Sequence, residues 1–446
     1  MTNAFYTRLQ QPVDSAALAC FRIFFGLVAC WDLLWHLHSG AVEQIWARPK
    51  LHFTYYGFGW VQPWFGDHIH LLFWVLAVLA LGIALGFLYR ICAPLFFLGF
   101  TYTFLMERAA FQNHFYLLCL LAFLLIFMPL HQTWSVDARL GWTRPSTTIP
   151  VWCLWLLRLQ LGIVYFYGGL AKLNTDWLQG EPMRLWLSAY GDYFLIGPYV
   201  QQDWLAYFFS WGGLLLDLLV VPGLLWHRSR LWAYGISLSF HLTNSWIFTI
   251  GIFPWFMIGA TTLFFAPDWP RRLWCRIGGG SVVAPPTPTS SAPRWMLHLL
   301  AVYTAVQLLL PFTHLLYTGN TSWTEQGQRF AWRMMLRDKQ GRHQIHLRDP
   351  ASGVHWRAKL EKYLAPWQIR AGLNDPDMLL QFAHHLARLN KQEGLGHIEI
   401  YADAQISLNG RKPQFMVDPK VNLAAQPRSL APYPWIVPLH RPLKGP

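Results

Sequence analysis

Lys172 is the residue whose position most suggests chemistry, because it ends an apolar run that is long enough to cross a membrane. The end of this run reads "YFYGGLAKLNTDW" at residues 165 to 177, so Asn174 and Asp176 follow the lysine closely. A lysine at a helix end commonly extends its ammonium to the lipid headgroups. An amine at the edge of a low-dielectric pocket is also a usable base, because burial disfavours its charged form. The motif alone is compatible with both roles.

Other polar side chains are predicted at the same membrane depth as Lys172. They come from three further apolar runs and are Asn113, His114, His241, Asn244 and His314. A single histidine in an apolar helix is more often a packing residue, although ionisable groups inside a membrane are commonly functional. Because several such groups lie near one leaflet, the pattern favours one shared pocket in the outer half of the bundle.

Four more charged side chains are embedded in apolar runs. They are Arg22, Asp32, Arg158 and Asp217. Charges inside a membrane commonly pair with one another, so we expect structural pairs that hold the bundle together rather than catalytic groups.

The composition is typical of a membrane protein. Hydrophobic residues make up 54% of the chain and charged residues only 13%, whereas soluble domains have about 25% charged residues. The net charge of +13 is not concentrated in a basic stripe, so we expect no nucleic-acid partner. The six cysteines lack CxxC spacing and the histidines lack metal-ligand spacing, so no metal site is predicted. The N-terminus lacks the features of a cleaved signal, so we expect the first apolar run to be retained.

The predicted fold class is mainly α, with a polytopic bundle of about eight or nine membrane helices and a small extramembrane α+β domain. The apolar runs lie at 16–37, 70–90, 91–109, 114–130, 151–171, 204–226, 231–249, 250–267 and 295–316. The domain boundaries predicted from these runs are 1–277 for the main bundle, 278–293 for a flexible Gly/Ser/Pro/Thr linker, 294–317 for the last span and 318–446 for the extramembrane domain.

The loops give a predicted orientation for this multi-pass chain. Arginines are more numerous in the loops on the N-terminal side, which predicts a cytoplasmic N-terminus and a C-terminal domain on the outer side, periplasmic or lumenal. Residues 39–69 are too long and aromatic for a plain turn, and we expect an interfacial or re-entrant segment there.

The C-terminal region has a different character from the bundle. "DKQG" at 338–341 and "DPASG" at 349–353 are turn signals between predicted strands. "DPDMLLQFAHHLARLNKQEG" has an Asp cap, helical apolar spacing and a terminal glycine, and "HIEIYADAQISLNG" alternates as a strand does.

Several long motifs, in order along most of the chain, resemble the vitamin K-dependent γ-glutamyl carboxylases and their horizontally transferred transmembrane domain relatives. The motifs include "ACFRIFFGLVACWDLLW", "FQNHFYLLCLLAF", "VYFYGGLAKLNTDWLQG", "FHLTNSWIFTIGIFPWFM" and "LPFTHLLYTGNTSWTEQGQRFAWRMMLRDK". The resemblance implies that Lys172 is the base that deprotonates vitamin K hydroquinone. Reaction with O2 then gives the epoxide and a strong base, which removes a γ-proton from a glutamate side chain before CO2 adds to the carbanion.

The resemblance also implies roles for the other polar residues. We expect Lys172 and His114 to be catalytic, and a second group to support the quinone or a developing oxyanion. This second group is Asn113, His241, Asn244 and His314. The implied cofactor is reduced vitamin K, either phylloquinol or menaquinol, with O2 and CO2 as co-substrates. The implied partners are the lipid bilayer, the quinone and a glutamate-containing polypeptide.

Two features differ from the animal enzymes of that family. The extramembrane portion is shorter, and Ala171 stands before Lys172 where those enzymes have a second lysine. Quinol oxygenation is therefore supported more directly than carboxylation. The alternatives are a quinol epoxidase that acts on another acceptor and a non-enzymatic quinone-binding membrane protein. A transporter is less favoured, because no internal repeat is evident.

Overall fold

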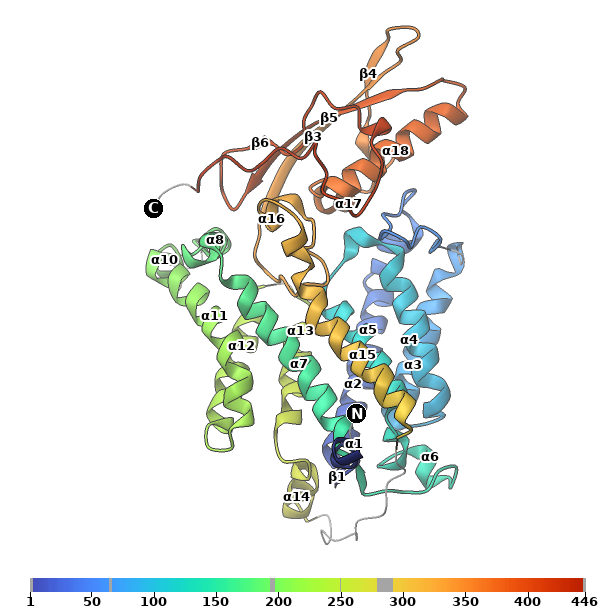
Figure 1. The fold of residues 1–446 in the computed structure, drawn as a ribbon, viewed down its shortest axis with the longest axis vertical. Helices are drawn as coiled ribbons and strands as arrows, with labels where there is room; N and C mark the ends of the chain where they lie inside the picture. The colour runs from blue at the N-terminus through green and yellow to red at the C-terminus, as the bar shows by residue number, and fades with distance from the viewer. Residues whose placement is uncertain (1–2, 64–65, 193–196, 249, 279–291, 444–446) are drawn as a thin grey trace.

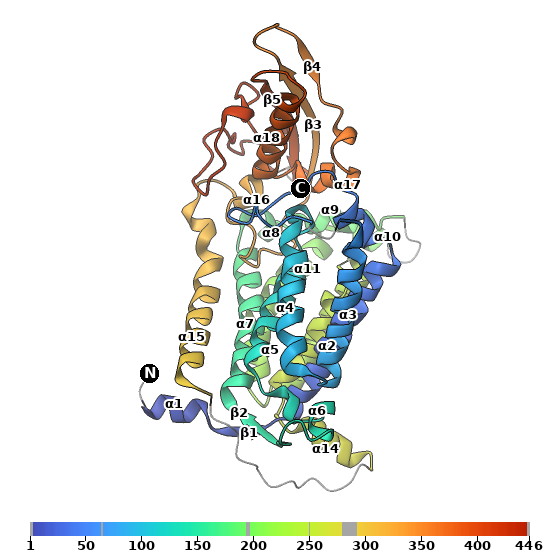
Figure 2. The same ribbon diagram turned by 90° about the vertical axis from the view of Figure 1, so that its right-hand side faces the viewer.

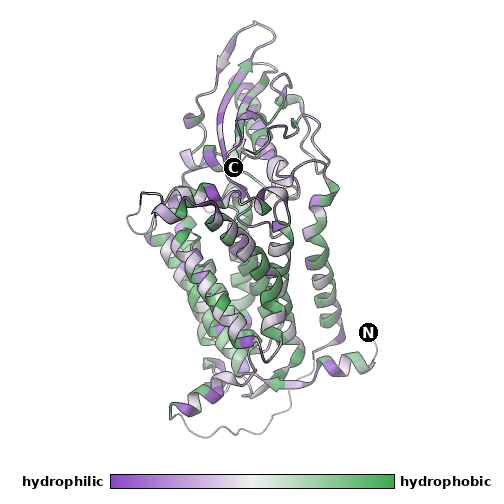
Figure 3. Ribbon diagram, turned by 90° about the vertical axis from the view of Figure 1, so that its left-hand side faces the viewer, coloured by the Kyte–Doolittle hydropathy of each residue, from purple (hydrophilic) through white to green (hydrophobic). Residues whose placement is uncertain are grey.

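The computed structural model describes residues 3–63, 66–192, 197–248, 250–278 and 292–443. It consists of a helical bundle with a sheet-containing C-terminal domain at one end (Figure 1). The N-terminus lies toward the opposite end of the bundle (Figure 2). Apolar residues dominate the helices of the bundle, whereas the two ends are more polar (Figure 3).

Each apolar run that the sequence predicts contains one helix of the bundle. The helices are α2 (Ala16–His38), α3 (Ile69–Leu85), α4 (Tyr89–Met106), α5 (Asn113–Phe127), α7 (Val151–Lys172), α11 (Asp203–Leu225), α12 (Arg230–Ile247), α13 (Phe253–Ala260) and α15 (Arg294–Leu309). Among the described residues, five are long and apolar enough to span a membrane, namely α2, α4, α7, α11 and α15 with its continuation to Leu316. The apolar helices α3, α5 and α13 with its continuation to Phe264 are shorter. The chain is therefore an integral membrane protein with five candidate spans among the described residues. This supports the predicted membrane bundle but not the predicted number of eight or nine spans.

Short elements cover both ends of the bundle. On the N-terminal side they are α1 (Asn3–Leu9), β1 (Pro12–Asp14), α6 (Val136–Arg139), β2 (Thr148–Pro150) and α14 (Trp269–Arg276). On the side of the C-terminal domain they are α8 (Thr175–Leu178), α9 (Met183–Ser188), α10 (Gly197–Val200) and α16 (Thr321–Thr324). The predicted linker falls mostly on residues 279–291, which lie outside the described part of the chain.

The embedded arginines are held by backbone carbonyls rather than by carboxylates. Arg22 is fully buried and donates to the carbonyl oxygens of Leu130 and Trp134, each at 2.8 Å. Arg158 donates to the carbonyl oxygens of Leu263 and Phe265 at 2.8 and 2.9 Å. The expected ion pairs are therefore wrong for both arginines, because carbonyls freed at nearby helix ends accept their hydrogen bonds.

The embedded aspartates also have separate partners. Asp32 lies one turn from His36 in α2, with its Oδ2 3.4 Å from the His36 Nδ1. Asp217 in α11 contacts Lys172 at the end of α7. Asp217 is thus paired, as expected of an embedded charge. Its partner, however, is Lys172 and not one of the other three embedded charges.

The C-terminal domain is a four-stranded antiparallel sheet with two helices. The strands follow the order β4-β3-β5-β6, and the elements are β3 (Lys339–Arg348), β4 (His355–Arg357), α17 (Pro366–Gly372), α18 (Pro376–Gln392), β5 (Glu399–Leu408) and β6 (Gln414–Phe415). Alternate residues of β5 from Ile400 to Leu408 are buried, as the sequence alternation predicted. The predicted turn at 349–353 connects β3 to β4, whereas the one predicted at 338–341 is wrong, because Lys339 already pairs with Leu408.

Residues 39–69 join the bundle to this domain. After the π-helical turn at Glu43–Ala47 the chain is irregular over residues 48–63, and Phe53 is buried in the hydrophobic core of the C-terminal domain. The backbone N–H of Thr54 donates to Gln381 Oε1 of α18 at 2.9 Å. These contacts dock the segment onto the C-terminal domain, and its interfacial or re-entrant position stays a prediction.

A buried charge cluster fastens α18 to the end of α4. Asp375 Oδ2 lies 3.1 Å from Arg108 Nη2 and 2.5 Å from Arg329 Nη1. Arg108 also contacts Asp377, which in turn lies 2.9 Å from Arg428 Nε. Asp375 additionally caps α18 through the backbone N–H groups of Asp377 and Met378. Burial raises the pKa of Asp375, but the charges of Arg108 and Arg329 outweigh it and hold this pKa well below its usual range.

Asp375→Asn should destabilise the attachment of the C-terminal domain, because Arg329 loses its carboxylate partner and Arg108 keeps only Asp377. Breaking a buried pair in this way costs roughly 3–5 kcal/mol. The carboxylate stabilises the folded state above the pKa of an unfolded aspartate, about 4, and this stabilisation is lost as the pH falls through the lower folded value. Thermal unfolding in detergent should therefore show a lower midpoint and a weaker acid dependence for the variant.

The matched control for this prediction is Glu361→Gln, which removes an exposed carboxylate of the same domain. Equal unfolding midpoints for Asp375→Asn and Glu361→Gln at neutral pH would contradict the role assigned to the cluster.

Candidate functional site

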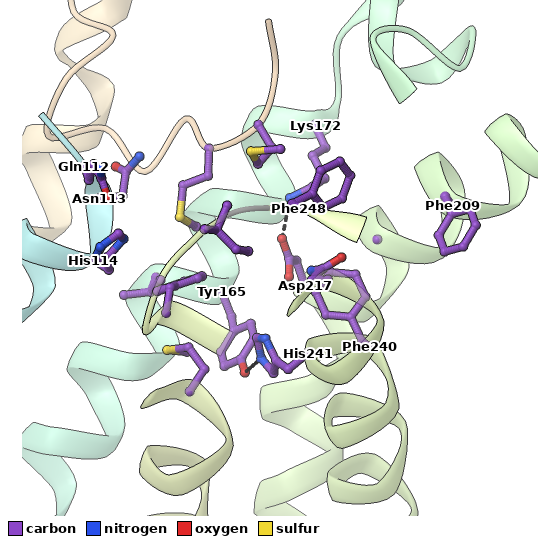
Figure 4. Close-up of a pocket in the computed structure, with 18 of the residues that line it drawn as sticks. Gln112, Asn113, His114, Tyr165, Lys172, Phe209, Asp217, Phe240, His241 and Phe248 are labelled. Atoms are coloured by element: carbon purple, nitrogen blue, oxygen red, sulfur yellow. Dashed lines mark hydrogen bonds and ion pairs between the residues drawn. The ribbon is translucent and has the colours of Figure 1, made fainter. Parts of the chain in front are cut away.

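A cavity of about 370 Å³ lies near the end of the bundle that faces the C-terminal domain. Its wall combines residues from α5, α7, α11, α12 and α13 with the segment that precedes β3 (Figure 4). Half of the wall residues are phenylalanine, tryptophan or methionine, and these are Phe111, Trp177, Met183, Trp186, Phe209, Phe240, Phe248, Phe253, Met257, Met334 and Met335. Such a wall suits a flat apolar ligand, and the few polar groups in it can fix its orientation.

The structure brings together five of the six predicted site residues. Lys172, Asn113, His114, His241 and Asn244 all line the cavity. Polar groups from α5, α7 and α12 therefore meet at one cavity, whose wall also includes α11 and α13.

His314 is not among the residues that line this cavity. It lies in the 3₁₀ continuation of α15, Leu310–Leu316, where its Nδ1 is 2.8 Å from the carbonyl oxygen of Pro311. Its backbone packs against Gly327, where a Cβ atom would lie 2.4 Å from the His314 Cα. The expectation that His314 reaches the shared pocket is wrong in this structure, because a local carbonyl and the adjoining loop hold its ring and backbone in place.

Lys172 forms a buried ion pair with Asp217 at the cavity wall. The Lys172 Nζ lies 2.5 Å from Asp217 Oδ2 and 3.3 Å from the carbonyl oxygen of Gly168, and both charged residues are 6% exposed. The ring of Trp177 lies 5.3 Å from the same Nζ, within cation–π range. The ammonium therefore points inward rather than toward the lipid headgroups, which excludes simple snorkelling (Figure 4).

Two adjacent glycines allow α7 to approach α11 closely enough for this pair. A Cβ atom at Gly168 would lie 3.2 Å from Asp217 Oδ2, and one at Gly169 would lie 2.8 Å from the side chain of Leu218. Gly213 on α11 likewise leaves room beside the Lys172 stem, since its Cβ would lie 3.9 Å from the Lys172 Cε. Small residues allow close packing of membrane helices, and here they also set the distance between the two charges.

The "LNTDW" residues that follow Lys172 fix the end of α7. The Asn174 side chain accepts a hydrogen bond from the Trp177 backbone and caps α8. Trp177 Nε1 donates to the carbonyl oxygen of Ser210 in α11 at 2.7 Å. Asp176 forms a bidentate pair with Arg411 of the C-terminal domain, at 2.6 and 2.7 Å. The C-terminal domain thus helps to hold the helix end that carries Lys172.

The segment between α16 and β3 covers one side of the cavity with Met334 and Met335. Its ends are held together by Glu325, which forms a two-point ion pair with Arg337 at 2.6 and 2.7 Å. Met335 has a positive φ of 53°, a backbone conformation that is costly for such a side chain and is often found at functional sites. The fully buried Trp332 ring packs 5.0 Å from Tyr116 of α5, so this cover is fixed to the bundle.

Tyr165 is a cavity residue that the sequence did not single out. Its phenol oxygen lies 2.8 Å from His241 Nε2, so the two side chains connect α7 to α12. The sequence feature that could have indicated Tyr165 is its distance from Lys172. The two residues are about two helical turns apart and therefore share a face of α7.

Four polar side chains of the cavity have no hydrogen-bond partner within the described part of the chain. They are Gln112, Asn113, His114 and Asn244. The His241 Nδ1 atom is also buried without a partner among the described residues. Asn113 and Asn244 are half-buried and His114 lines the cavity, so a bound molecule can reach these groups, whereas the His241 Nδ1 atom is enclosed.

The cavity can thus bind a flat apolar molecule whose polar atoms face an ion pair and several free amide and imidazole groups. Within the described residues, no cluster of three or more metal-ligating side chains is present.

Comparison with known proteins identifies both parts of the chain. Residues 10–269 match the HTTM domain, and residues 292–442 match the family described as vitamin K-dependent gamma-carboxylase, lumenal domain. No solved structure matches the chain. The first match covers more than half of the sequence, and the two follow one another in the order that the motifs indicated. The chain therefore belongs to the vitamin K-dependent gamma-carboxylase family.

Proposed function

We propose that this protein is a membrane enzyme that oxygenates reduced vitamin K, as phylloquinol or menaquinol, and uses the reaction to carboxylate glutamate side chains of a polypeptide. The observation that carries the proposal is the pairing of Lys172 with Asp217 in an apolar cavity that also contains unpartnered amide and imidazole groups.

The cavity fits the quinol in shape and in chemistry. Its aromatic and methionine wall matches a fused-ring molecule, which stacks well on such side chains. Lys172 lies on one side of the cavity, on α7, whereas Asn113 and His114 come from the start of α5. A ring with a hydroxyl group on each of two opposite carbons can therefore have one oxygen at the ion pair and the other at the α5 groups. The quinol supplies the strong base for glutamate when it reacts with O2.

Lys172 and Asp217 would act together as the proton acceptor. An ammonium that already carries its proton cannot accept another, so the proton must first move along the 2.5 Å contact to Asp217 Oδ2. The Lys172 Nζ can then accept the proton of a ligand hydroxyl. The net result is a neutral carboxylic acid and an ammonium that faces the ligand oxygen, where it stabilises negative charge in a low-dielectric site.

The other polar groups would orient the ligand and stabilise charge. Asn113, His114 and Asn244 can donate hydrogen bonds to ligand oxygens, because no described residue occupies them. Tyr165 holds the His241 ring in place through the 2.8 Å contact. Donors fixed in advance around a developing oxyanion are among the largest contributions to catalysis.

The C-terminal domain supports the choice of a polypeptide acceptor. This domain matches the lumenal domain of the carboxylases, and the segment that leads to its first strand forms part of the cavity wall. A glutamate side chain of a peptide bound on this side would have a short path to the quinol. The covering methionines would also keep water away from a strong base.

Lys172→Met should abolish epoxide formation, because the variant keeps the apolar stem and loses the amine. The expected loss is about 10²–10⁴-fold, the usual contribution of a general base. The assay uses protein in lipid nanodiscs with reduced vitamin K and O2, and epoxide is followed by chromatography. A Glu-rich peptide and labelled bicarbonate added in parallel test carboxylation.

Lys412→Met is the matched control, since this lysine is exposed and lies outside the cavity. Wild-type rates of epoxide formation by Lys172→Met would contradict the assignment. Epoxide without label in the peptide would indicate a quinol epoxidase with another acceptor, and bound quinone without epoxide would indicate a non-enzymatic binding protein.

Asp217→Asn distinguishes the proposed pair from a lone lysine base. If Asp217 must take the lysine proton, asparagine should lower the rate of epoxide formation about 100-fold or more while quinone binding is retained. A lone lysine would instead become easier to deprotonate without its counter-charge, and the activity would persist or extend to lower pH. Asp32→Asn provides the same change at an embedded carboxylate that does not line the cavity. Activity of Asp217→Asn equal to that of this control would argue against the pair.

A further inference from the structure

A second cavity of about 480 Å³ lies between α11 and α12. Its wall is almost entirely apolar, and among the described residues that line it only Ser239 and Thr243 have a hydroxyl group. Several wall residues face the lipid side of the bundle, since Phe208, Leu219 and Ile236 are each at least 60% exposed. This space is therefore a groove that opens toward the hydrocarbon region of the membrane.

The groove adjoins the cavity that contains Lys172. Phe209, Gly213 and Phe240 line both spaces, so they form the wall that the two spaces share. A Cβ atom at Gly213 would lie 3.7 Å from the rings of Phe240 and Trp177 and 3.9 Å from the Lys172 Cε. Because Gly213 has no side chain, this shared wall is thin beside Lys172.

Adjacent glycines keep the groove open along α11. Gly212 precedes Gly213 and lines the groove, and a Cβ atom at Gly212 would meet nothing within 4 Å. The opposite wall on α12 has the small side chains of Ala233 and Ser239. The helix pair is thus shaped to leave an elongated apolar space rather than to close it.

We propose that this groove binds the isoprenoid side chain of the quinol whose ring lies against Lys172. The inference rests on the proposed function, because it extends the same ligand from the polar cavity into the groove. The ring needs the polar groups of the first cavity, whereas a branched hydrocarbon chain needs an apolar channel that continues from it. Because the groove opens to lipid, a membrane-dissolved quinol can enter sideways between α11 and α12 without passing through water.

Gly212→Phe is designed to fill the groove without disturbing the cavity. Gly235→Phe is the matched control, because Gly235 is also an exposed helical glycine with open space around its Cβ position and lines neither cavity. Epoxide formation is measured in nanodiscs with tail-less menadiol and with menaquinols of one to four isoprene units. Thermal unfolding of both variants establishes that they are folded.

The wild-type KM should fall as the tail lengthens. Gly212→Phe should raise the KM for menaquinol-4 about tenfold or more, with the KM for menadiol unchanged, because apolar contacts of the tail are lost. Gly235→Phe should behave as the wild type does with every quinol. A KM that is independent of tail length, or the same KM for both variants, would overturn the proposal and leave the groove to a lipid acyl chain.

A second measurement separates this inference from the proposed function. Menaquinone-4 retained by purified wild type, Gly212→Phe and Gly235→Phe is quantified by mass spectrometry after incubation in detergent. Retention by the wild type and Gly235→Phe but not by Gly212→Phe supports the groove even if no epoxide is ever formed. Equal retention by both variants overturns the groove, whatever the enzymatic activity.

Discussion

The buried ion pair of Lys172 and Asp217 is the constraint around which the membrane part of this protein is arranged. Two charges in an apolar bundle are costly unless their geometry is close and the remaining hydrogen-bond groups are satisfied. Here the adjacent glycines of α7 set the approach of the two helices, and the Trp177 ring covers the ammonium. In the mechanism that we propose, the carboxylate at 2.5 Å takes the proton of the lysine.

The C-terminal domain takes part in building the site as well as in covering it. Arg411 pairs with Asp176 four residues after Lys172, and the segment with Met334 and Met335 forms part of the cavity wall. The Asp375 cluster fastens the same domain to the end of α4. Through these contacts the C-terminal domain, which we propose to bind the peptide, is attached directly to the helix end that carries Lys172.

The sequence predicted those features that depend on local pattern. Apolar runs located the helices, and polar residues at a common depth identified Asn113, His114, His241 and Asn244 as neighbours of Lys172. Helix α18 and strand β5 followed from a cap and from alternation. The partners could not be predicted in this way, because the contact of Lys172 with Asp217 and that of Asp176 with Arg411 join residues far apart in the chain. His314 has the right depth but is held by Pro311 and Gly327, which depth alone does not reveal.

The most direct test of the account is an experimental structure with menaquinone-4 bound in nanodiscs. The account predicts the ring in the cavity of α5, α7, α11 and α12, with one ring oxygen within about 3 Å of the Lys172 Nζ, the distance of a hydrogen bond. It also predicts that Asp217 stays on the far side of that amine. A ring bound elsewhere, or a Lys172 ammonium turned toward the lipid headgroups with no ligand contact, would contradict the central role of the ion pair.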